Sequence, residues 1–591
     1  MLMEVNTGNA KMVEAFSEAG PKYPISNSLM YSIYKMLPND TDLTVFRKQG
    51  KIQGFNFAFI DNHYNYHTAQ DDFRHLSHQS VAHQGTYLMP LLSYFSNSDL
   101  TSLNSTHDEV YFNTPVNFMH YPFKWVFAML AVAVVLFLFF AFIGVGKRIL
   151  IPGEIGRGFL LFIGAVVVTG GLTWFLWKGL LTFYPQYNDI MQGFTYNGHS
   201  YIAAFVFLSL AIGFLFYMNS KSETVTMSYS VAPLFFWLII NLLIAIFLPG
   251  AGFFIIPVFF ALLMFGWYVI TQNASKVLNL ILAIPAIIIF VPFIIMFPIG
   301  LGLKILYGSA MLTVLVFGLL MPVFGSFSGK GLWSALCFVT SIGFFMYAHW
   351  NSGYETGKAK PNSLLYVYDA EKNKALWATY DTNLDEWTKN YLTANPNDGK
   401  PLADFPLYSK YNSAFTYTHD APLKSLPKPS VEFLMDSVVG EQRYVKIRVT
   451  PNRKVNRYDI FANEKMTIHN MKANGAKPLG QKGSQLERNG KKIISYYVVD
   501  NEPLEMQFSF NKTQFFDMHL MESSFDLLSN PMFQIIKRDG AMMPTPFVLN
   551  DAVVIKMRIV PTPKIKLPVV NLNSGIPEIL RDTLTVPEFE N

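Results

Sequence analysis

Long apolar runs fill the middle of the chain and separate two polar segments. The runs follow one another from Trp125 to Ala348, and each is close to the roughly 20 residues that a helix needs to cross a bilayer. They predict eight transmembrane helices, with approximate extents Trp125–Gly146, Phe159–Trp177, Ile202–Met218, Val231–Leu248, Phe253–Thr271, Val277–Ile299, Ile305–Val323 and Leu332–Ala348.

The polar segment that follows the apolar region has the pattern of a β-rich domain. Short β-type runs, several of them alternating, are separated by clusters of Gly, Pro, Asn and Lys, and they predict an antiparallel β-sandwich over residues 357–591. The clearest runs are LLYVYD, YVKIRVT, KIISYYVVD and LEMQFSF. A stretch that includes Trp377 and Trp387 is predicted to be helical.

The polar segment at the start, residues 1–120, mixes helical and strand patterns. Short helices are predicted around Val13–Phe16 and Ser26–Leu37. Gly54–Ile60 is apolar on both faces, as is typical of a strand that is covered on both sides in an α/β sheet. The expected fold class is therefore a mixed membrane protein, with a partial α/β segment (1–120), an eight-helix bundle (121–356) and a β-sandwich-like domain (357–591).

Composition supports a membrane protein and excludes some functions. Apolar residues make up 51% of the chain and charged residues only 15%, which is too apolar for an ordinary soluble protein. The net charge of +5 gives no case for nucleic acid as a partner. The single cysteine, Cys337, excludes an intrachain disulfide. No signal peptide opens the chain, so we expect the true amino terminus to lie upstream.

The distribution of Lys and Arg predicts the orientation of the bundle. If the first segment faces outward, the inner loops hold six basic residues and the outer loops and run ends hold three. The positive-inside rule favours this orientation. An even number of spans then places both soluble parts on the extracytoplasmic side, which is the periplasm in a bacterium or the lumen of a vacuole or endoplasmic reticulum.

Polar side chains gather just beyond the predicted strand at Gly54–Ile60. The triplet Tyr66-His67-Thr68 is followed by Asp71 and Asp72. Groups past the carboxyl end of such a strand lie where open α/β sheets place their active sites. One histidine is not a metal site, so on the residues alone His67 is either a surface histidine or a site residue.

A second group of histidines, at positions 75, 78 and 83, has spacings of three and five. These spacings do not put all three side chains on one face of a helix, so they do not predict a metal site.

The first segment resembles the carboxyl-terminal half of the catalytic domain in metallopeptidase family 28, a family of zinc aminopeptidases and their relatives. The closest likeness is to its membrane-embedded members, the vacuolar membrane proteases and endoplasmic reticulum metallopeptidases. The similar block runs roughly from residue 4 to residue 97. The motifs that carry the resemblance are Asn39-Asp40-Thr41-Asp42, the strand QGFNFAFI, and Tyr66-His67-Thr68-Ala69-Gln70-Asp71.

The resemblance implies roles for particular residues. His67 matches the last ligand of a two-zinc site, and Tyr66 matches a tyrosine that polarises the substrate carbonyl in some relatives. Asp71 matches an aspartate that begins a helix and stands near the ligand. Asp40 or Asp42 is either a group that orients the His67 ring or the cap of a loop.

The resemblance also implies that most of the zinc site lies outside this sequence. In the family pattern the other metal ligands and the general-base glutamate come earlier, and Glu4 does not match any of them. We therefore expect a carboxyl-terminal piece or the second half of a split gene. Such a piece would hold at most part of the zinc site and would be inactive alone. An upstream chain with the first half is then a possible partner, besides the bilayer and a peptide substrate.

Three functions are compatible with the sequence. The first is a membrane-bound zinc exopeptidase, present here as its carboxyl-terminal part. The second is a non-catalytic relative that keeps the scaffold for binding or assembly. The third is a transporter with accessory domains, which is disfavoured because the interiors of the eight apolar runs contain no Asp, Glu, Lys or Arg. Asn241 and Asn279 are their notable polar residues.

Overall fold

The computed structural model describes residues 2–5, 7–34, 41–402, 405–478 and 481–561. By its internal contacts the chain forms two compact units. The first comprises Met1–Tyr66 and Gln70–Gly353, and the second comprises His67–Ala69 and Tyr354–Asn591.

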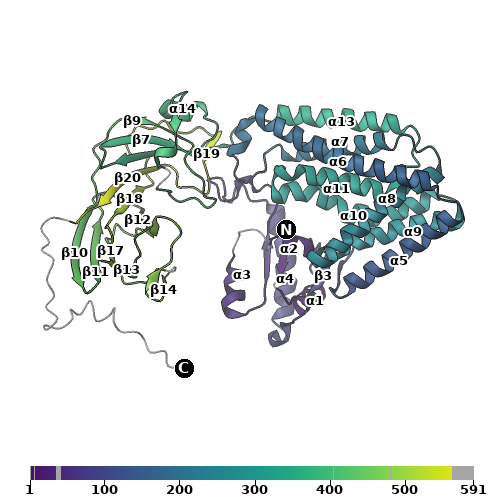
Figure 1. Cartoon of the computed structure of the whole chain (residues 1–591), viewed down its shortest axis with the longest axis horizontal. Helices are drawn as coiled ribbons and strands as arrows, with labels where there is room; N and C mark the ends of the chain where they lie inside the picture. Colours follow the sequence, from purple (N-terminus) through teal and green to yellow (C-terminus); the bar gives the residue numbers. More distant parts are fainter. Residues whose placement is uncertain (1, 6, 35–40, 403–404, 479–480, 562–591) are drawn as a thin grey trace. The chain divides into compact units, whose positions relative to one another are not determined.

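Most of the first unit is a helical bundle, in which long helices run side by side (Figure 1). The helix α5 shows why these segments are membrane spans. Its 22 residues are apolar all round, and at 1.5 Å per residue they rise about 33 Å, close to the thickness of a bilayer core. The long helices of the bundle are α5 (Trp125–Gly146), α6 (Pro152–Phe183), α7 (Gly198–Phe216), α8 (Glu223–Phe247), α9 (Ile255–Thr271), α10 (Lys276–Leu301) and α13 (Lys330–Trp350).

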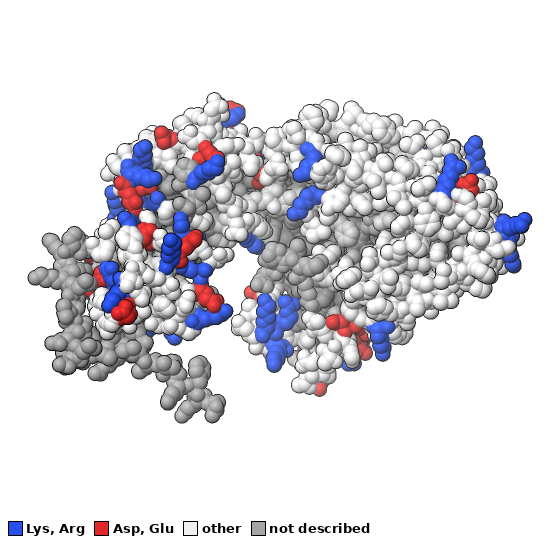
Figure 2. All heavy atoms as spheres, in the orientation of Figure 1, with Lys and Arg blue, Asp and Glu red and all other residues white. Residues whose placement is uncertain are grey.

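The surface of the bundle agrees with burial in lipid. On the face shown in Figure 2, charged side chains gather toward the ends of the helices, and the surface between them is uncharged. Many large apolar side chains on α5 are exposed, for example Phe142 at 80%. A water-soluble protein rarely exposes so large an apolar surface, so these residues are suited to lipid. The chain is an integral membrane protein.

Seven helices among the described residues are long and apolar enough to cross a membrane, not the eight that the apolar runs predicted. The run Ile305–Val323 forms a shorter helix, α11 (Leu306–Leu319), which is preceded by the 3₁₀ turn Leu303–Ile305. A separate short helix, α12 (Met321–Phe324), follows it. Pro322 lies in the first turn of α12, and a proline there cannot donate the backbone hydrogen bond that would continue α11.

The first 122 residues form a small mixed layer with its own core. Val13 and Phe16 of one helix pack against Tyr87 and Leu91 of another and Tyr111 of a strand. The elements are β1 (Leu2–Val5), α1 (Ala10–Ala19), α2 (Ser28–Tyr34), α3 (Asp42–Val45), β2 (Phe55–Ala58), α4 (His78–Phe95), β3 (Glu109–Asn113) and β4 (Phe118–Pro122), with the short turns η1 (Phe46–Gly50), η2 (His63–Asn65) and η3 (Leu100–Leu103).

The predicted central strand is present as β2, but it is not covered on both faces. Its four residues are all half-buried, and among the described residues only β1 pairs with it, in an antiparallel register. The side chains of Phe55 and Phe57 lie against the small core, while Asn56 and Ala58 occupy the alternate positions. The expectation of a strand buried in a wider α/β sheet was therefore wrong for the described part of the chain.

This layer docks onto the bundle through a short 3₁₀ helix, η5 (Pro249–Phe254), between α8 and α9. The hydroxyl of Ser28 donates a hydrogen bond of 2.6 Å to the carbonyl oxygen of Gly250. The rings of Phe112 and Phe253 stack with their centroids 5.1 Å apart. Leu29 and Phe112 also belong to the main hydrophobic core of the bundle, so the layer and the membrane helices share one core.

The hairpin β3–β4 carries a charged pair that predicts a dependence of stability on pH. Glu109 and His120 are diagonal neighbours on the two strands, and the His120 ring hydrogen-bonds to the Glu109 carboxylate. This bond raises the pKa of His120 above its usual value of 6.5. Because the folded state holds the proton more tightly, its stabilising effect is fully present below pH 6.5 and is lost as the pH rises through the raised pKa.

We expect Glu109→Gln to lower the free energy of unfolding at acidic pH by about 1 kcal/mol, because the hydrogen bond from the His120 ring loses its negatively charged acceptor. The difference from the wild type should shrink toward alkaline pH. Melting temperatures of the two proteins, measured from about pH 5 to 8 in the range where histidines titrate, test this. His107→Asn, at an exposed histidine, is the control and should keep the wild-type profile. Parallel profiles for Glu109→Gln and the wild type would contradict the prediction.

The second unit is built from two β-sheets, as the alternating runs predicted. Apolar residues from both sheets, among them Val445, Phe508, Ile460 and Leu520, form one core. The six-stranded sheet has the order β10-β11-β17-β13-β15-β14, with β10 (Ser430–Val439), β11 (Gln442–Thr450), β13 (His469–Ala473), β14 (Gln481–Lys482), β15 (Gln485–Leu486) and β17 (Leu504–Asn511).

The larger sheet has eight strands. All its neighbouring strands are antiparallel except β20 and β6, which are parallel. Its order is β16-β12-β18-β20-β6-β7-β9-β8, with β16 (Lys492–Tyr497), β12 (Arg457–Ala462), β18 (Met518–Ser524), β20 (Ala552–Ile559), β6 (Leu365–Asp369), β7 (Lys374–Thr379), β9 (Tyr417–Ala421) and β8 (Asn397–Asp398). A further pair, β5 (Lys360–Asn362) and β19 (Met542–Pro544), is parallel.

The helical prediction around Trp377 and Trp387 was half right. Trp387 lies on the short helix α14 (Glu386–Leu392), whose amino terminus is capped by the Asp385 carboxylate. Trp377 lies on β7 instead, where its ring packs into the core between the sheet and α14. Pairing of β7 with strands on both sides decided this, and such long-range contacts override a weak local preference.

Candidate functional site

His67 lies on an irregular turn that follows β2 and the 3₁₀ turn η2. Its side chain is exposed, and its backbone φ is 57°, in the left-handed region that few residues other than glycine adopt. Tyr66, the residue before it, is 52% exposed. Histidine is one of the residue types enriched in this region, and fifteen other non-glycine residues of the described chain adopt it, so the φ value by itself assigns His67 no role.

The resemblance implied that a helix begins at Asp71, but no helix begins there. The helix α4 begins at His78, and the Ser77 hydroxyl accepts a hydrogen bond from the backbone N–H of Ser80. Of the three histidines at 75, 78 and 83, only the last two are therefore helical.

The reason is the neighbouring Asp72. Its carboxylate accepts hydrogen bonds from the backbone N–H and guanidinium of Arg74 and from the backbone N–H of His75. These bonds hold a turn that competes with the helix. The bond from Arg74 also holds the pKa of Asp72 well below its usual range.

The other acidic candidates do not complete a metal site with His67 among the described residues. Asp42 is exposed in the first turn of α3, and Asp71 is exposed in the loop before α4. Asp40 lies outside the described residues. Within the described ranges, no group of three or more His, Cys, Asp or Glu side chains is close enough to hold a metal ion. The residues present therefore do not fit a complete zinc site, and His67 offers one nitrogen only.

Residues 192–199, between α6 and α7, contact the loop that leads into His67. The side-chain amide of Gln192 donates a hydrogen bond of 3.1 Å to the backbone oxygen of Tyr66. His63, four residues before the predicted ligand, stacks on Phe194, and burial lowers its pKa. Reasoning from the sequence missed this contact. The one signal in the sequence that could have indicated it is the aromatic and polar composition of the connection between α6 and α7.

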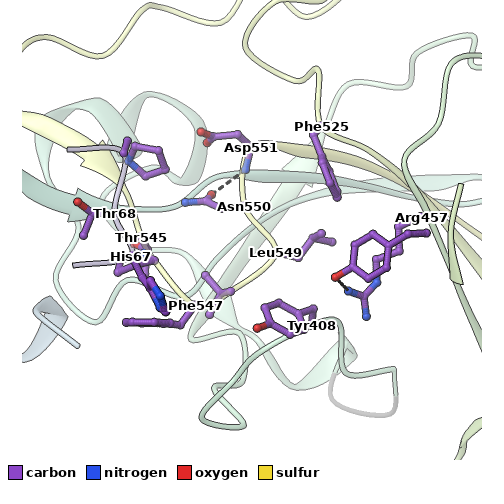
Figure 3. Close-up of a pocket in the computed structure, with 15 residues that line it drawn as sticks. His67, Thr68, Tyr408, Arg457, Phe525, Thr545, Phe547, Leu549, Asn550 and Asp551 are labelled. Atoms are coloured by element: carbon purple, nitrogen blue, oxygen red, sulfur yellow. Dashed lines mark hydrogen bonds between the residues drawn. The ribbon is translucent and has the colours of Figure 1, made fainter. Parts of the chain in front are cut away.

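The second unit contains a pocket of about 420 Å³ (Figure 3). Arg457 lies at one end, between the rings of Tyr408 and Tyr497, with its guanidinium 5.2 and 4.9 Å from their centroids. The pocket is lined by His67, Thr68, Ala69, Tyr408, Arg457, Tyr497, Phe525, Pro544, Thr545, Pro546, Phe547, Val548, Leu549, Asn550 and Asp551.

The charged groups of this pocket are already paired. Arg457 forms two hydrogen bonds of 2.9 Å with Asp459, and Asp551 forms two with Arg538. The His67 ring meets the Phe547 ring edge-on, with centroids 5.4 Å apart. The lining is therefore aromatic and without net charge, which suits stacking on an uncharged group better than proton transfer.

Comparison with known proteins agrees with the resemblance. Residues 2–92 match the model of peptidase family M28. Endoplasmic reticulum metallopeptidase 1 of Homo sapiens is 24% identical over 243 residues, which cover 38% of this chain and 26% of that protein. The Rattus norvegicus protein of the same name is 28% identical over 109 residues, or 18% of this chain and 12% of its own length. No solved structure matches.

The chain is thus a relative of the membrane-type M28 metallopeptidases. The matched region spans about a quarter of the length of the human relative and less of the rat one. The family model covers the segment that carries Tyr66 and His67, and it ends within α4.

Proposed function

We propose that this chain is the carboxyl-terminal part of a membrane-bound zinc exopeptidase. The observation that carries the proposal is the match of residues 2–92 to peptidase family M28, together with an exposed His67 on a turn directly after β2. In this proposal His67 supplies one nitrogen ligand, and the remaining ligands and the general base belong to polypeptide outside this sequence. The chain alone is then inactive.

The proposal gives a role to three kinds of residue in this chain: the histidine ligand, a carboxylate beside it and the tyrosine before it. His67 binds through a neutral ring nitrogen, and a carboxylate such as Asp42 or Asp71 orients the ring. Tyr66 donates its phenol O–H to the oxygen of the substrate carbonyl as negative charge develops there. When zinc is bound, it supplies an activated water for attack on a peptide bond near a free amino terminus.

An exposed apolar stripe on α4 supports the proposal that further polypeptide covers the first segment. Val81, Leu88, Met89 and Leu92 lie on one helical face, and all are 46–67% exposed. Gly85 lies on the same stripe with open space around it, so a neighbouring element can approach closely. Together with the half-buried β2, this surface is suited to the strands and helices of the first half of a peptidase domain, supplied by preceding sequence or by a separate chain.

The proposal assigns the parts of the chain as follows. Residues 1–120 are the carboxyl-terminal half of the catalytic domain, 121–356 are the membrane region, and 357–591 are a β-rich domain of unassigned role. If the run Ile305–Val323 crosses the membrane as α11 and α12 in place of one long helix, the number of crossings is even, as the sequence predicted. Both soluble parts are then extracytoplasmic or lumenal, in agreement with the distribution of basic residues.

The test is to express the chain together with the sequence encoded upstream of Met1. We expect zinc in the purified protein and release of amino-terminal residues from peptides. His67→Ala should lower zinc content and reduce activity by at least about 100-fold, since even changes beside a ligand cost 10- to 100-fold. His107→Ala, at an exposed histidine outside the motif, is the matched control and should keep the zinc content and the activity of the wild type.

Full zinc content and full activity in His67→Ala would contradict the proposal. If no peptidase activity is found, uptake of a peptide into proteoliposomes that survives His67→Ala would favour the transporter instead.

A further inference from the structure

The loop that leads from β2 to His67 is held by a segment of the membrane bundle. The loop as far as Tyr66 and this bundle segment belong to the first unit, whereas His67 is part of the second. Asp61 accepts a hydrogen bond of 3.1 Å from the ring of His199, in the first turn of α7. Three further contacts are the stack of His63 on Phe194 at 5.5 Å, the contact of the Tyr64 and Tyr196 rings at 4.4 Å, and the hydrogen bond from Gln192 to the backbone oxygen of Tyr66.

The bundle segment is itself firmly held. The side-chain amide of Asn197 donates hydrogen bonds of 2.8 Å to the Tyr187 hydroxyl and to the backbone oxygen of Ala348 in α13. The backbone oxygen of Gly193 accepts a hydrogen bond of 2.7 Å from the N–H of Leu303, beyond α10. Phe194 is fully buried. Residues 192–199 are therefore anchored at three places, the 3₁₀ turn Pro185–Asp189, the helix α13 and the 3₁₀ turn Leu303–Ile305, so they offer a firm surface to the loop.

We infer that residues Gln192–His199 are a positioning element for the loop Asp61–Tyr66, which leads to His67. The loop has internal hydrogen bonds, such as the one of 3.0 Å from the Tyr66 N–H to the His63 carbonyl oxygen, and its contacts with the bundle fix where it lies. The bond from Gln192 fixes the carbonyl of the peptide that joins Tyr66 to His67. The role of the Tyr66-His67 turn rests on the proposed function. The positioning of the loop by the bundle rests only on the contacts described above.

The four contacts do not contribute equally. The Asp61 and His199 side chains are 52% and 47% exposed, and exposed ion pairs contribute little. The Phe194 ring cannot be removed without opening a cavity inside the bundle. The hydrogen bond from Gln192 is therefore the contact to test, because its loss affects the turn and leaves the bundle core intact.

The experiment measures hydrogen exchange by mass spectrometry on the full chain in lipid nanodiscs. In Gln192→Ala we expect amides of residues 61–67 to exchange about 3- to 10-fold faster, in keeping with the loss of one hydrogen bond. Gln192→Glu has nearly the same shape but no N–H to donate, so residues 61–67 should exchange faster in this variant too. Asn188→Ala, which removes an exposed amide bonded only locally to the backbone oxygen of Pro185, is the matched control and should show no change. Amides of α1 provide the internal reference.

A second readout separates this inference from the proposed function. Zinc binding to the protein extended upstream is measured with zinc chloride alone, for the wild type and Gln192→Ala. Faster exchange together with about 10-fold weaker zinc binding supports both the positioning inference and the proposed function. Faster exchange with unchanged zinc binding supports positioning by the bundle and contradicts the role of His67 as a ligand. Unchanged exchange at residues 61–67 in both Gln192 variants overturns the inference.

Discussion

Asp459→Asn is expected to destabilise the β-rich unit by about 3–5 kcal/mol, the cost of breaking a buried ion pair from one side. Asp459 on β12 is completely buried, and its partner Arg457 is 3% exposed. The carboxylate accepts two hydrogen bonds from Arg457 and one from the Ser495 hydroxyl. The asparagine keeps the volume but removes the charge, so the Arg457 guanidinium would be left buried without an opposing charge, although it keeps hydrogen bonds to Tyr497 and Ser495.

The measurement is pulse proteolysis of the full chain across a urea series, following the fragment that contains the second unit. Glu487→Gln is the matched control. The pair of Glu487 and Lys482 is 57% and 80% exposed, and an exposed pair contributes about 0–1 kcal/mol. A midpoint for Asp459→Asn that equals that of the control would contradict the prediction.

Gly250→Ala is expected to weaken the docking of the first segment on the bundle by about 2–4 kcal/mol. A Cβ at position 250 would lie 2.5 Å from the Ser32 hydroxyl oxygen and 2.6 Å from the backbone oxygen of Ser28. Backbone must therefore move, which costs about 1–3 kcal/mol, and the buried bond from Ser28 to the Gly250 carbonyl is lost as well.

This loss should appear as faster hydrogen exchange and proteolysis in residues 7–34, while the membrane helices stay protected. The control is Gly171→Ala in α6, where an added Cβ meets no atom within 4 Å. Alanine is the better helix former, so this variant should be neutral or slightly stabilised. Equal protection of residues 7–34 in the two variants would show that the contact at Gly250 is dispensable.

The sequence predicted the membrane spans well where the pattern was local. The run Trp125–Gly146 coincides with α5, because an uninterrupted apolar stretch of this length has one stable form in lipid. The prediction from the sequence was wrong at α11, where Pro322 ends the regular helix inside an apolar run. Hydropathy alone does not register a missing backbone donor, so the run Ile305–Val323 looked like a full span.

The candidate site was predicted in part. The turn with Tyr66 and His67 follows β2 and is exposed, and the family match covers it. The start of a helix at Asp71 was wrong, because the carboxylate of Asp72 holds a turn that only the neighbouring Arg74 and His75 can complete. The roles of Tyr66, His67, Asp40, Asp42 and Asp71 stay predictions.

By itself, the sequence determined that this chain crosses a membrane, ends in a β-rich unit and carries the Tyr66-His67 motif of a peptidase relative. These properties depend on composition, periodicity and short motifs, which are local along the chain. Only the tertiary structure decided that β2 has one partner among the described residues and that Gln192 meets Tyr66 across 126 positions. Contacts of this range depend on how helices pack, and no local pattern records them.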